Sequence, residues 1–282
     1  MFLKKICSII GIGLLICFSF YYTDSAVNIV KRNDPIMKEI IKVSNQYEVF
    51  AVDATLINNS IIPGINGTKL DIDASYSSMK RFGEFNSSLL KFSEVEPTIS
   101  INNSYDKYII SGNKSKHEVA LLFKINNTSY IEEILTILIS NNVEATFFLD
   151  LDTIVSSPDI LMLLSKGKQN IELLGKNGYK IAEVLLAIRT LRKFNKNNAR
   201  FCYLEQENND VLNICNRQKL YTVIPNIITD NYPYSDVKYN LSNGSIIKLD
   251  NNINTVRELR YIVRYIKQKG YHIKSLNDML KE

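Results

Sequence analysis

The chain has 282 residues, 45% of them hydrophobic and 22% charged, which is typical of a globular protein and excludes the disordered and collagen-like classes. Its 34 basic and 29 acidic residues give a net charge of +5, spread along the chain without a run of five or more like charges. Nucleic-acid binding needs a concentrated basic stripe, so we expect no nucleic-acid partner. A mild attraction to anionic cell-wall polymers or lipid headgroups fits the surplus equally well.

The N-terminus carries the pattern of an exported protein. A pair of lysines precedes residues 6–22, an uncharged and largely apolar stretch of about 17 residues, which is the minimum for a membrane span. We therefore predict a membrane anchor or signal segment at 1–23, in a single-pass cell-membrane protein whose remaining residues lie outside the cytoplasm. The alternative is a cleaved signal and a secreted product, with Ser25-Ala26 as a poor cleavage site.

Two further segments precede the main domain. Asp34 as cap and Pro35 at the first helical position predict a helix within 24–48, which would be a stalk or a short packing helix. Residues 49–117 contain short apolar runs separated by turn residues, together with a short helix that Asp73 would cap. This pattern predicts a small α+β unit.

From residue 118 the apolar runs alternate between strand and helix character. The predicted strands are 119–123, 145–149, 171–174, 200–204, 221–225 and 245–249, with a last strand or turn at 271–274. The predicted helices are 130–140, 158–166, 181–194, 209–218 and 255–269. Regular alternation of this kind is typical of an α/β domain, here 118–282, with a parallel sheet or barrel and helices outside.

The cysteine and histidine content limits the available chemistry. Cys202 and Cys215 would both lie outside the cytoplasm, where disulfides persist, but the sequence leaves open whether they pair. The chain has two histidines, His117 and His272, and neither has a partner four residues away. No CxxC or Cys/His cluster indicates zinc.

Three regions of the chain resemble those of a known family and follow one another in the same order as in that family. VALLFKINN is followed by a helix and by NNVEATFFLD, then come ARFCYLEQ and finally GSIIKLDNN with a long helix after it. These segments resemble the polysaccharide deacetylase (carbohydrate esterase) family, and Val143–Phe148 matches its Val-x-Ala-Thr-Phe-Phe strand closely. The resemblance implies a distorted (β/α)7-type deacetylase barrel over 118–282.

The residues that carry the family's chemistry are missing. Where the family has an Asp pair that supplies a base and a metal ligand, this chain has Lys124 and Ile125. Lys176 and Lys180 replace two metal-binding histidines, and Asp250 replaces the histidine that acts as general acid. The resemblance therefore implies that the divalent metal site is lost, that the chain has no cofactor, and that no catalytic residue is assigned.

We therefore hypothesise a catalytically inactive pseudoenzyme that acts in cell-envelope carbohydrate binding or assembly, with cell-wall polysaccharide or an envelope protein as partner. The candidate cleft residues are Lys124, Asp150, Lys176, Arg200, Tyr203 and Asp250. Two alternatives stay open. One is a metal-independent hydrolase with Lys124 as base or Asp250 as acid. The other is a structural, partner-binding protein that uses its N-terminal unit.

Overall fold

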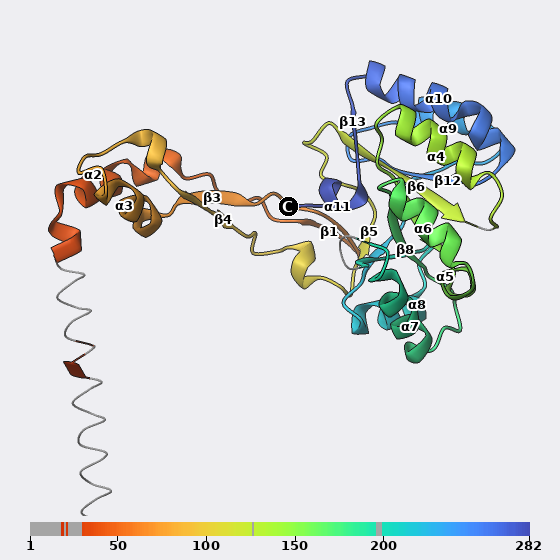
Figure 1. The fold of residues 1–282 in the computed structure, drawn as a ribbon, viewed down its shortest axis with the longest axis horizontal. Coiled ribbons are helices and arrows are strands. Elements are labelled where there is room, and N and C mark those ends of the chain that lie inside the picture. The colour runs from red at the N-terminus through yellow and green to blue at the C-terminus, as the bar shows by residue number, and fades with distance from the viewer. Residues whose placement is uncertain (1–17, 20, 22–29, 126, 196–198) are drawn as a thin grey trace, which may run out of the picture. The chain divides into compact units, whose positions relative to one another are not determined.

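The computed structural model describes residues 18–19, 21, 30–125, 127–195 and 199–282 (Figure 1). This part of the chain forms two compact units, one from residues up to 51 together with 66–95, and one from 52–65 together with 96–282. The predicted anchor at 1–23 lies outside the described residues, apart from 18, 19 and 21. No helix among the described residues has the length and apolar character needed to cross a membrane.

The first unit is a pair of helices beside a two-stranded antiparallel sheet. Its apolar core is small and is formed by Met37, Ile40, Leu70, Tyr76, Met79 and Leu90. Its elements are α2 (Pro35–Ser44), α3 (Ile72–Lys80), β3 (Gly67–Leu70) and β4 (Phe92–Val95), with short 3-10 turns at Asn45–Tyr47 and Ser87–Leu89. The helix predicted within 24–48 is therefore present, and it packs against α3 as part of this unit.

Aspartates begin both helices of this unit. Asp34 caps α2 as predicted, because its Oδ1 accepts a hydrogen bond from the Ile36 amide. The α3 cap is Asp71, whose carboxylate accepts from the Ala74 amide, and not the predicted Asp73. Asp73 lies within the first turn, where its charge favours the helix N-terminus.

The second unit is a single sheet covered by helices. Along the described residues its eleven strands follow the order β1-β2-β5-β10-β9-β8-β7-β6-β12-β11, with β13 added beside β6. The strands are β1 (Thr55–Ile57), β2 (Ser60–Ile62), β5 (Tyr108–Ile109), β6 (Glu118–Ile125), β7 (Thr146–Leu149), β8 (Asn170–Leu174), β9 (Phe201–Tyr203), β10 (Tyr221–Val223), β11 (Ile227–Ile228), β12 (Ile246–Asp250) and β13 (His272–Lys274). The helices are α4 (Ile131–Ser140), α5 (Leu151–Ser156), α6 (Pro158–Lys166), α7 (Ile181–Leu191), α8 (Asn209–Arg217), α9 (Pro233–Asn240), α10 (Ile253–Gln268) and α11 (Leu276–Met279), with a 3-10 turn at Ile101–Asn103.

Every strand pair in this sheet is parallel except β1 with β2. The prediction of an α/β domain with a parallel sheet is therefore confirmed. The sheet is open where the structure describes it, because its two ends, β1 and β11, do not pair with each other.

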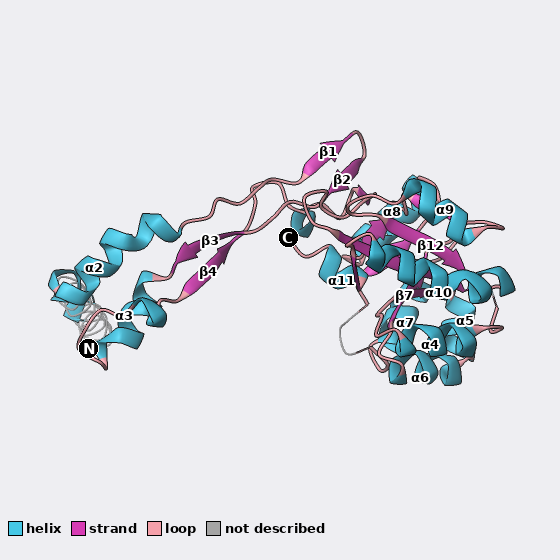
Figure 2. Ribbon diagram, turned by 90° about the horizontal axis from the view of Figure 1, so that it is seen from above, coloured by secondary structure: helices cyan, strands magenta, loops and turns pink. Residues whose placement is uncertain are grey.

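The side chains of each strand alternate between two apolar layers. On β6, Val119, Leu121 and Phe123 belong to the larger core beneath the helices, whereas Ala120 and Leu122 belong to the core on the inner face. Helices α4 and α10 lie beside each other over the outer face (Figure 2). The same alternation turns every second residue of β6 and β12 toward the inner face, which matters for the site described below.

The boundary between the units differs from the one predicted at 117. Strand β2 pairs with β5, and β5 pairs with β10, so 52–65 and 96–117 extend the edge of the large sheet. Of the predicted α+β unit, only 49–51 and 66–95 belong to the first compact unit. These edge strands are two or three residues long, too short for a sequence pattern to show that they pair with a strand more than a hundred residues away.

Cys202 and Cys215 form a disulfide that links β9 to α8, with their Cα atoms 6.4 Å apart. This separation lies within the usual range for a disulfide. The sequence left open whether the two cysteines pair, and in the structure they do. The bond connects α8 to β9. On this strand the residue after Cys202 is Tyr203, whose side chain faces the inner side of the sheet.

The Glu282 side chain joins the edge segments of the second unit. Its Oε1 accepts hydrogen bonds from the Gly64 amide at 2.7 Å and from the Ile101 amide at 3.2 Å, and its Oε2 accepts from the Ser100 hydroxyl. All of these bonds are buried. The side chain therefore fixes two chain segments that are far apart in sequence.

We expect Glu282→Ala to lower the free energy of unfolding of this unit by about 1–3 kcal/mol, because two buried amides lose their acceptor. Urea unfolding followed by circular dichroism measures the change. Lys281→Ala is the matched control, since that side chain is exposed, and it should change stability by less than about 0.5 kcal/mol. Equal effects of the two substitutions would contradict this assignment.

Candidate functional site

A pocket of about 400 Å³ opens at the carboxyl ends of the central strands. This is the edge of a parallel α/β sheet where ligand and catalytic sites usually lie. Its lining residues are Lys124, Ile125, Asp150, Leu174, Gly175, Lys176, Tyr203, Leu204 and Glu205.

A connected group of two lysines and two carboxylates lies at this edge, and we name it the lysine–carboxylate cluster: Lys124, Glu205, Lys248 and Asp250. Lys124 Nζ lies 2.9 Å from Glu205 Oε1, and Lys248 Nζ lies 2.6 Å from Asp250 Oδ2. Lys248 Nζ is also 3.8 Å from Glu205 Oε1, which connects the two pairs. The Lys248 side chain is 7% exposed, so this ammonium group lies inside the protein.

The local sequence explains why both lysines face inward. Lys124 follows Ala120 and Leu122 at two-residue spacing on β6, and Lys248 follows Ile246 in the same way on β12. The register places Asp250 opposite Lys124 and Lys248 opposite Leu122. The cluster is therefore a consequence of strand alternation and of the pairing of β6 with β12.

Tyr203 completes the surroundings of Glu205. Its hydroxyl donates a hydrogen bond to Glu205 Oε1 at 3.2 Å. Burial, and after it the charge and hydrogen bond of Glu205, raise the pKa of Tyr203, so the phenol stays protonated. Burial also acts to raise the pKa of Glu205, but the bonds and charges of Lys124, the charge of Lys248 and the Tyr203 hydroxyl outweigh it and leave this pKa lowered. Glu205 is therefore an ionised acceptor.

These residues do not fit a divalent metal ion. Glu205 and Asp250 are already paired with ammonium groups, and the Asp150 carboxylate caps α5 by accepting from the Thr153 amide. Two unit charges 4 Å apart interact by roughly 4 kcal/mol near a protein surface. A divalent ion would be repelled by each lysine with about twice that energy. Within the described residues, no three His, Cys, Asp or Glu side chains form a group that could hold a metal.

Four of the candidate cleft residues lie together in the pocket: Lys124, Asp150, Lys176 and Tyr203. Asp250 lies next to them through Lys248, and Ile125 lines the pocket at the end of β6. His117 and His272 lie at the opposite end of the sheet, where the His272 amide donates to the His117 carbonyl just before β6 begins.

Arg200, the remaining candidate, is not in this pocket. It precedes β9 at the amino end of the strands, where its guanidinium lies 5.3 Å from the centre of the Tyr221 ring. Its amide and that of Phe201 donate to the carboxyl of Glu172, which is fully buried on the inner face. Burial raises the pKa of Glu172 to about 8, against the lowering effect of these two hydrogen bonds. Arg200 thus belongs to a separate, structural network.

Sequence reasoning missed Lys248 and Glu205. The signal for Lys248 is a lysine at an inward position of an otherwise apolar strand, which requires a buried partner. Glu205 follows Tyr203 by two residues just beyond the end of β9, and its charge matches the two lysines. Neither signal reveals the pairing, because β6, β9 and β12 are far apart in sequence.

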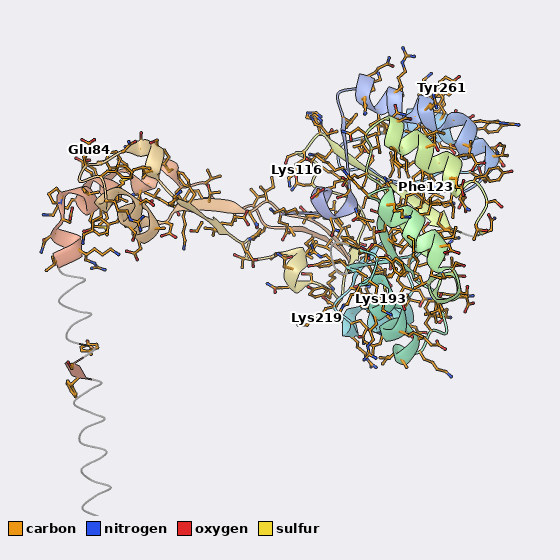
Figure 3. All side chains as sticks on the ribbon, in the orientation of Figure 1. Glu84, Lys116, Phe123, Lys193, Lys219 and Tyr261 are labelled. Carbon is orange, nitrogen blue, oxygen red and sulfur yellow. A yellow bond between two sulfur atoms is a disulfide. The ribbon has the colours of Figure 1, made fainter. Side chains whose placement is uncertain are left out.

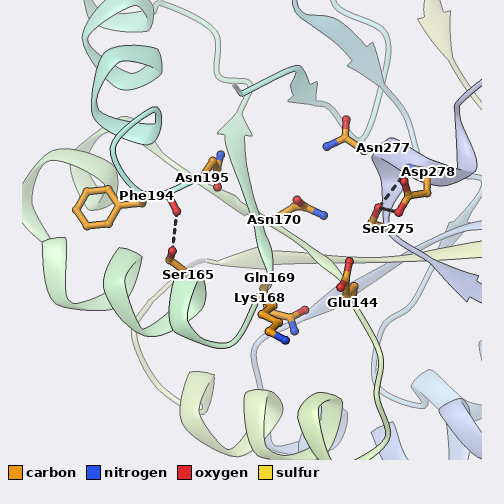
Figure 4. Close-up of a pocket in the computed structure, with 10 residues that line it drawn as sticks. All are labelled: Glu144, Ser165, Lys168, Gln169, Asn170, Phe194, Asn195, Ser275, Asn277 and Asp278. Atoms are coloured by element: carbon orange, nitrogen blue, oxygen red, sulfur yellow. Dashed lines mark hydrogen bonds between the residues drawn. The ribbon is translucent and has the colours of Figure 1, made fainter. Parts of the chain in front are cut away.

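A second pocket, of about 140 Å³, lies near the amino ends of β7 and β8 (Figure 4). Two of the side chains that line it, Gln169 and Asn195, form hydrogen bonds with the backbone at the strands. The Gln169 side chain accepts from the Ala145 amide, and the Asn195 side chain binds both the amide and the carbonyl of Ile171. Figure 4 shows the Ser165 hydroxyl bonded to the Phe194 carbonyl and Ser275 bonded to Asp278. These contacts give the pocket a structural role.

Comparisons with known proteins agree with the fold. No protein-family model matches the chain. A family 4 carbohydrate esterase from Bacillus anthracis aligns with a TM-score of 0.52 and 20% identity over 61% of this chain and 86% of its own. The peptidoglycan N-acetylglucosamine deacetylase Bc1960 aligns with a TM-score of 0.55 and 21% identity over 61% and 92%. The chain therefore has the fold of the polysaccharide deacetylases, as its sequence predicted.

A more extensive match is BA3943 from Bacillus anthracis, a pseudoenzyme of carbohydrate esterase family 4. Its structure aligns with a TM-score of 0.66 and 22% identity over 89% of this chain and 96% of its own. The uncharacterized protein YlxY of Bacillus subtilis is 25% identical over 91% of this chain and 86% of its own length. These matches include the N-terminal region as well as the deacetylase-like sheet.

The lowered pKa of Glu205 leads to a prediction about pH. Its ion pairs stabilise the fold above the ordinary pKa of a glutamate, and this contribution is lost as the pH falls through the lowered value. Glu205→Gln should therefore be less stable than the unchanged protein at pH 7, and the difference should shrink toward pH 3. Melting temperatures between pH 3 and 7 measure it, with Glu207→Gln, an exposed neighbour, as control. A difference that does not vary with pH would contradict the ion pairing.

Proposed function

We propose that this chain is a catalytically inactive protein with a deacetylase fold, which binds cell-wall polysaccharide in the cell envelope. The lysine–carboxylate cluster is the observation that carries the proposal. It takes the position at the strand ends where the family resemblance places a metal and a general base, and it engages Glu205 and Asp250 in ion pairs. The description of BA3943 as a pseudoenzyme supports the same reading.

The cluster also disfavours a metal-independent hydrolase. Lys124 Nζ lies 2.9 Å from Glu205 Oε1, and Asp250 Oδ2 lies 2.6 Å from Lys248 Nζ. Each group is therefore already engaged with a charged partner and would have to leave it before it could act on a substrate as base or acid.

Two observations support an envelope location. The disulfide between Cys202 and Cys215 is of a kind that persists in oxidising compartments outside the cytoplasm. The apolar stretch at residues 6–22 has the character of an anchor or signal segment. We propose a single-pass membrane protein with both compact units outside, and a secreted product as the alternative.

The pocket has the features of a glycan-binding site without catalysis. It is open to solvent, it carries donors from Lys124, Lys176 and Tyr203, and it presents carboxylates from Asp150 and Glu205. Sugar hydroxyls both donate and accept hydrogen bonds, so mixed donors and acceptors suit them. An acetylated oligosaccharide could then bind without being hydrolysed.

One NMR experiment tests binding and catalysis together. The full chain in detergent is mixed with an acetylated chitooligosaccharide, with and without zinc. Saturation transfer reports binding, and the free acetate signal reports hydrolysis. We expect transfer to the sugar and no acetate above the blank under either condition. Lys176→Ala should weaken the transfer, whereas Lys193→Ala, on the surface beyond α7, should leave it unchanged.

Zinc-dependent acetate release would show that the ligand positions have been wrongly assigned and that this is a working deacetylase. Absence of saturation transfer to the acetylated chitooligosaccharide would contradict the glycan-binding part of the proposal. An active family 4 esterase, run in parallel, confirms that the acetate signal is detectable.

A further inference from the structure

The exposed side of α10 carries four basic residues in a line, which we name the basic face: Arg257, Arg260, Arg264 and Lys267. Their spacing of three, four and three residues places them on one side of the helix. At 1.5 Å per residue the line is about 15 Å long. All four are exposed, and the helix between the first and the last of them adds exposed Tyr261.

The orientation of the basic face is fixed by the core. Leu259, Ile262 and Val263 on the opposite side of α10 are fully buried beneath it. The acidic residue of this helix, Glu258, is turned toward α9, where it accepts from the Tyr234 amide at 2.7 Å. The helix therefore cannot rotate to hide its arginines, and its own carboxylate does not lie among them.

The face is hollowed and has cations free for a ligand. A groove of about 530 Å³ is lined by Asn141, Arg260, Arg264, Lys267 and Gln268. Lys267 Nζ donates to the Asn141 carbonyl at 2.7 Å, which holds that lysine across the groove to the end of α4. None of the ion pairs between described residues includes Arg257, Arg260 or Arg264.

We propose that the basic face binds a linear polyanion with phosphodiester groups, of the poly(glycerol phosphate) kind. Guanidinium groups match phosphate oxygens in a planar, two-bond geometry, and three of them follow one another along the line. A single small anion would meet one or two of these cations, whereas a chain of regularly spaced phosphates meets all four. The proposal is independent of the pocket, because the lining residues of the two are different.

Two other polyanionic ligands, a lipid membrane and nucleic acid, fit the basic face less well. A helix that inserts into lipid exposes an apolar face, but the apolar face of α10 is buried in the core. Nucleic acid has the same phosphodiester chemistry, and here the choice rests on the proposed function, which puts this unit outside the cytoplasm.

The test compares two double substitutions that change the net charge equally. Arg260→Glu with Arg264→Glu alters the basic face. Lys193→Glu with Lys219→Glu is the control, at sites beyond α7 and α8 that lie far from Tyr261 (Figure 3). Binding of the full chain in detergent to immobilised poly(glycerol phosphate) is measured by biolayer interferometry from 50 to 200 mM salt. Circular dichroism verifies that each variant is folded.

We expect the first pair to weaken binding about tenfold or more and to reduce the slope of log K against log salt by about 2, one for each lost phosphate contact. The control pair should change the affinity by less than about threefold. If both double variants lost the same affinity, the effect would be due to net charge alone, and the proposal would be overturned. Absence of binding by the unchanged chain would also overturn it.

Two further probes distinguish the polymer from its competitors. Single-stranded DNA of equal charge, or vesicles with anionic lipid, should bind more weakly than poly(glycerol phosphate). Tighter binding to either would overturn the assignment of the ligand. Acetate release by the chain would refute the proposed function but leave this binding result standing, because the assay contains no acetyl group.

Discussion

The ammonium group of Lys248 lies on the inner face of the sheet, between the carboxylates of Asp250 and Glu205, and 7% of the Lys248 side chain is exposed. Moving a charged amine from water into a protein costs several kcal/mol, and only a closely paired opposite charge offsets that cost. The partners of Lys248 Nζ are Asp250 Oδ2 at 2.6 Å and Glu205 Oε1 at 3.8 Å. The two carboxylates are then committed to internal ion pairs. This commitment distinguishes the site from one that presents free carboxylates to a metal ion.

The rest of the second unit holds the cluster in place. Strands β6 and β12 pair in parallel, so their inward lysines emerge at the same edge of the sheet. The outer residues of these strands, such as Phe123 and Leu249, are fully buried beneath the helices. On β9, Cys202 faces outward and is bonded to Cys215 of α8, while Tyr203 faces inward and donates to Glu205. A covalent link on one side of the strand thus supports a hydrogen bond on the other.

The sequence predicted the parts of this architecture that depend on local pattern. The alternation of strands and helices after residue 118, the Asp34 cap and the deacetylase-like strand at 143–148 all follow from neighbouring residues, and the structure confirms the parallel α/β domain. The pattern did not indicate which strands pair. For that reason the sequence pattern groups Arg200 with the cleft although it lies at the amino end of β9. The pattern also does not indicate Lys248 and Glu205, which complete the ion-pair chain. The division of residues 49–117 between two units was missed for the same reason.

The concentration of charge on α10 is a second feature that the linear sequence does not reveal. The sequence shows no run of adjacent like charges here, because Arg257, Arg260, Arg264 and Lys267 are separated by other residues. Helical spacing brings them onto one side, and burial of the opposite side orients them toward solvent. A count of charges along the sequence therefore underestimates how concentrated they are on the folded surface.

The central claim is that lysines, and not a metal, neutralise the carboxylates at the strand ends. A crystal structure of the protein soaked in zinc, with data collected on both sides of the zinc absorption edge, tests it directly. The account predicts continuous density for Lys248 between Asp250 and Glu205 and no anomalous peak in the pocket. An anomalous peak ligated by Asp150, Glu205 or Asp250, with the lysines displaced, would contradict it.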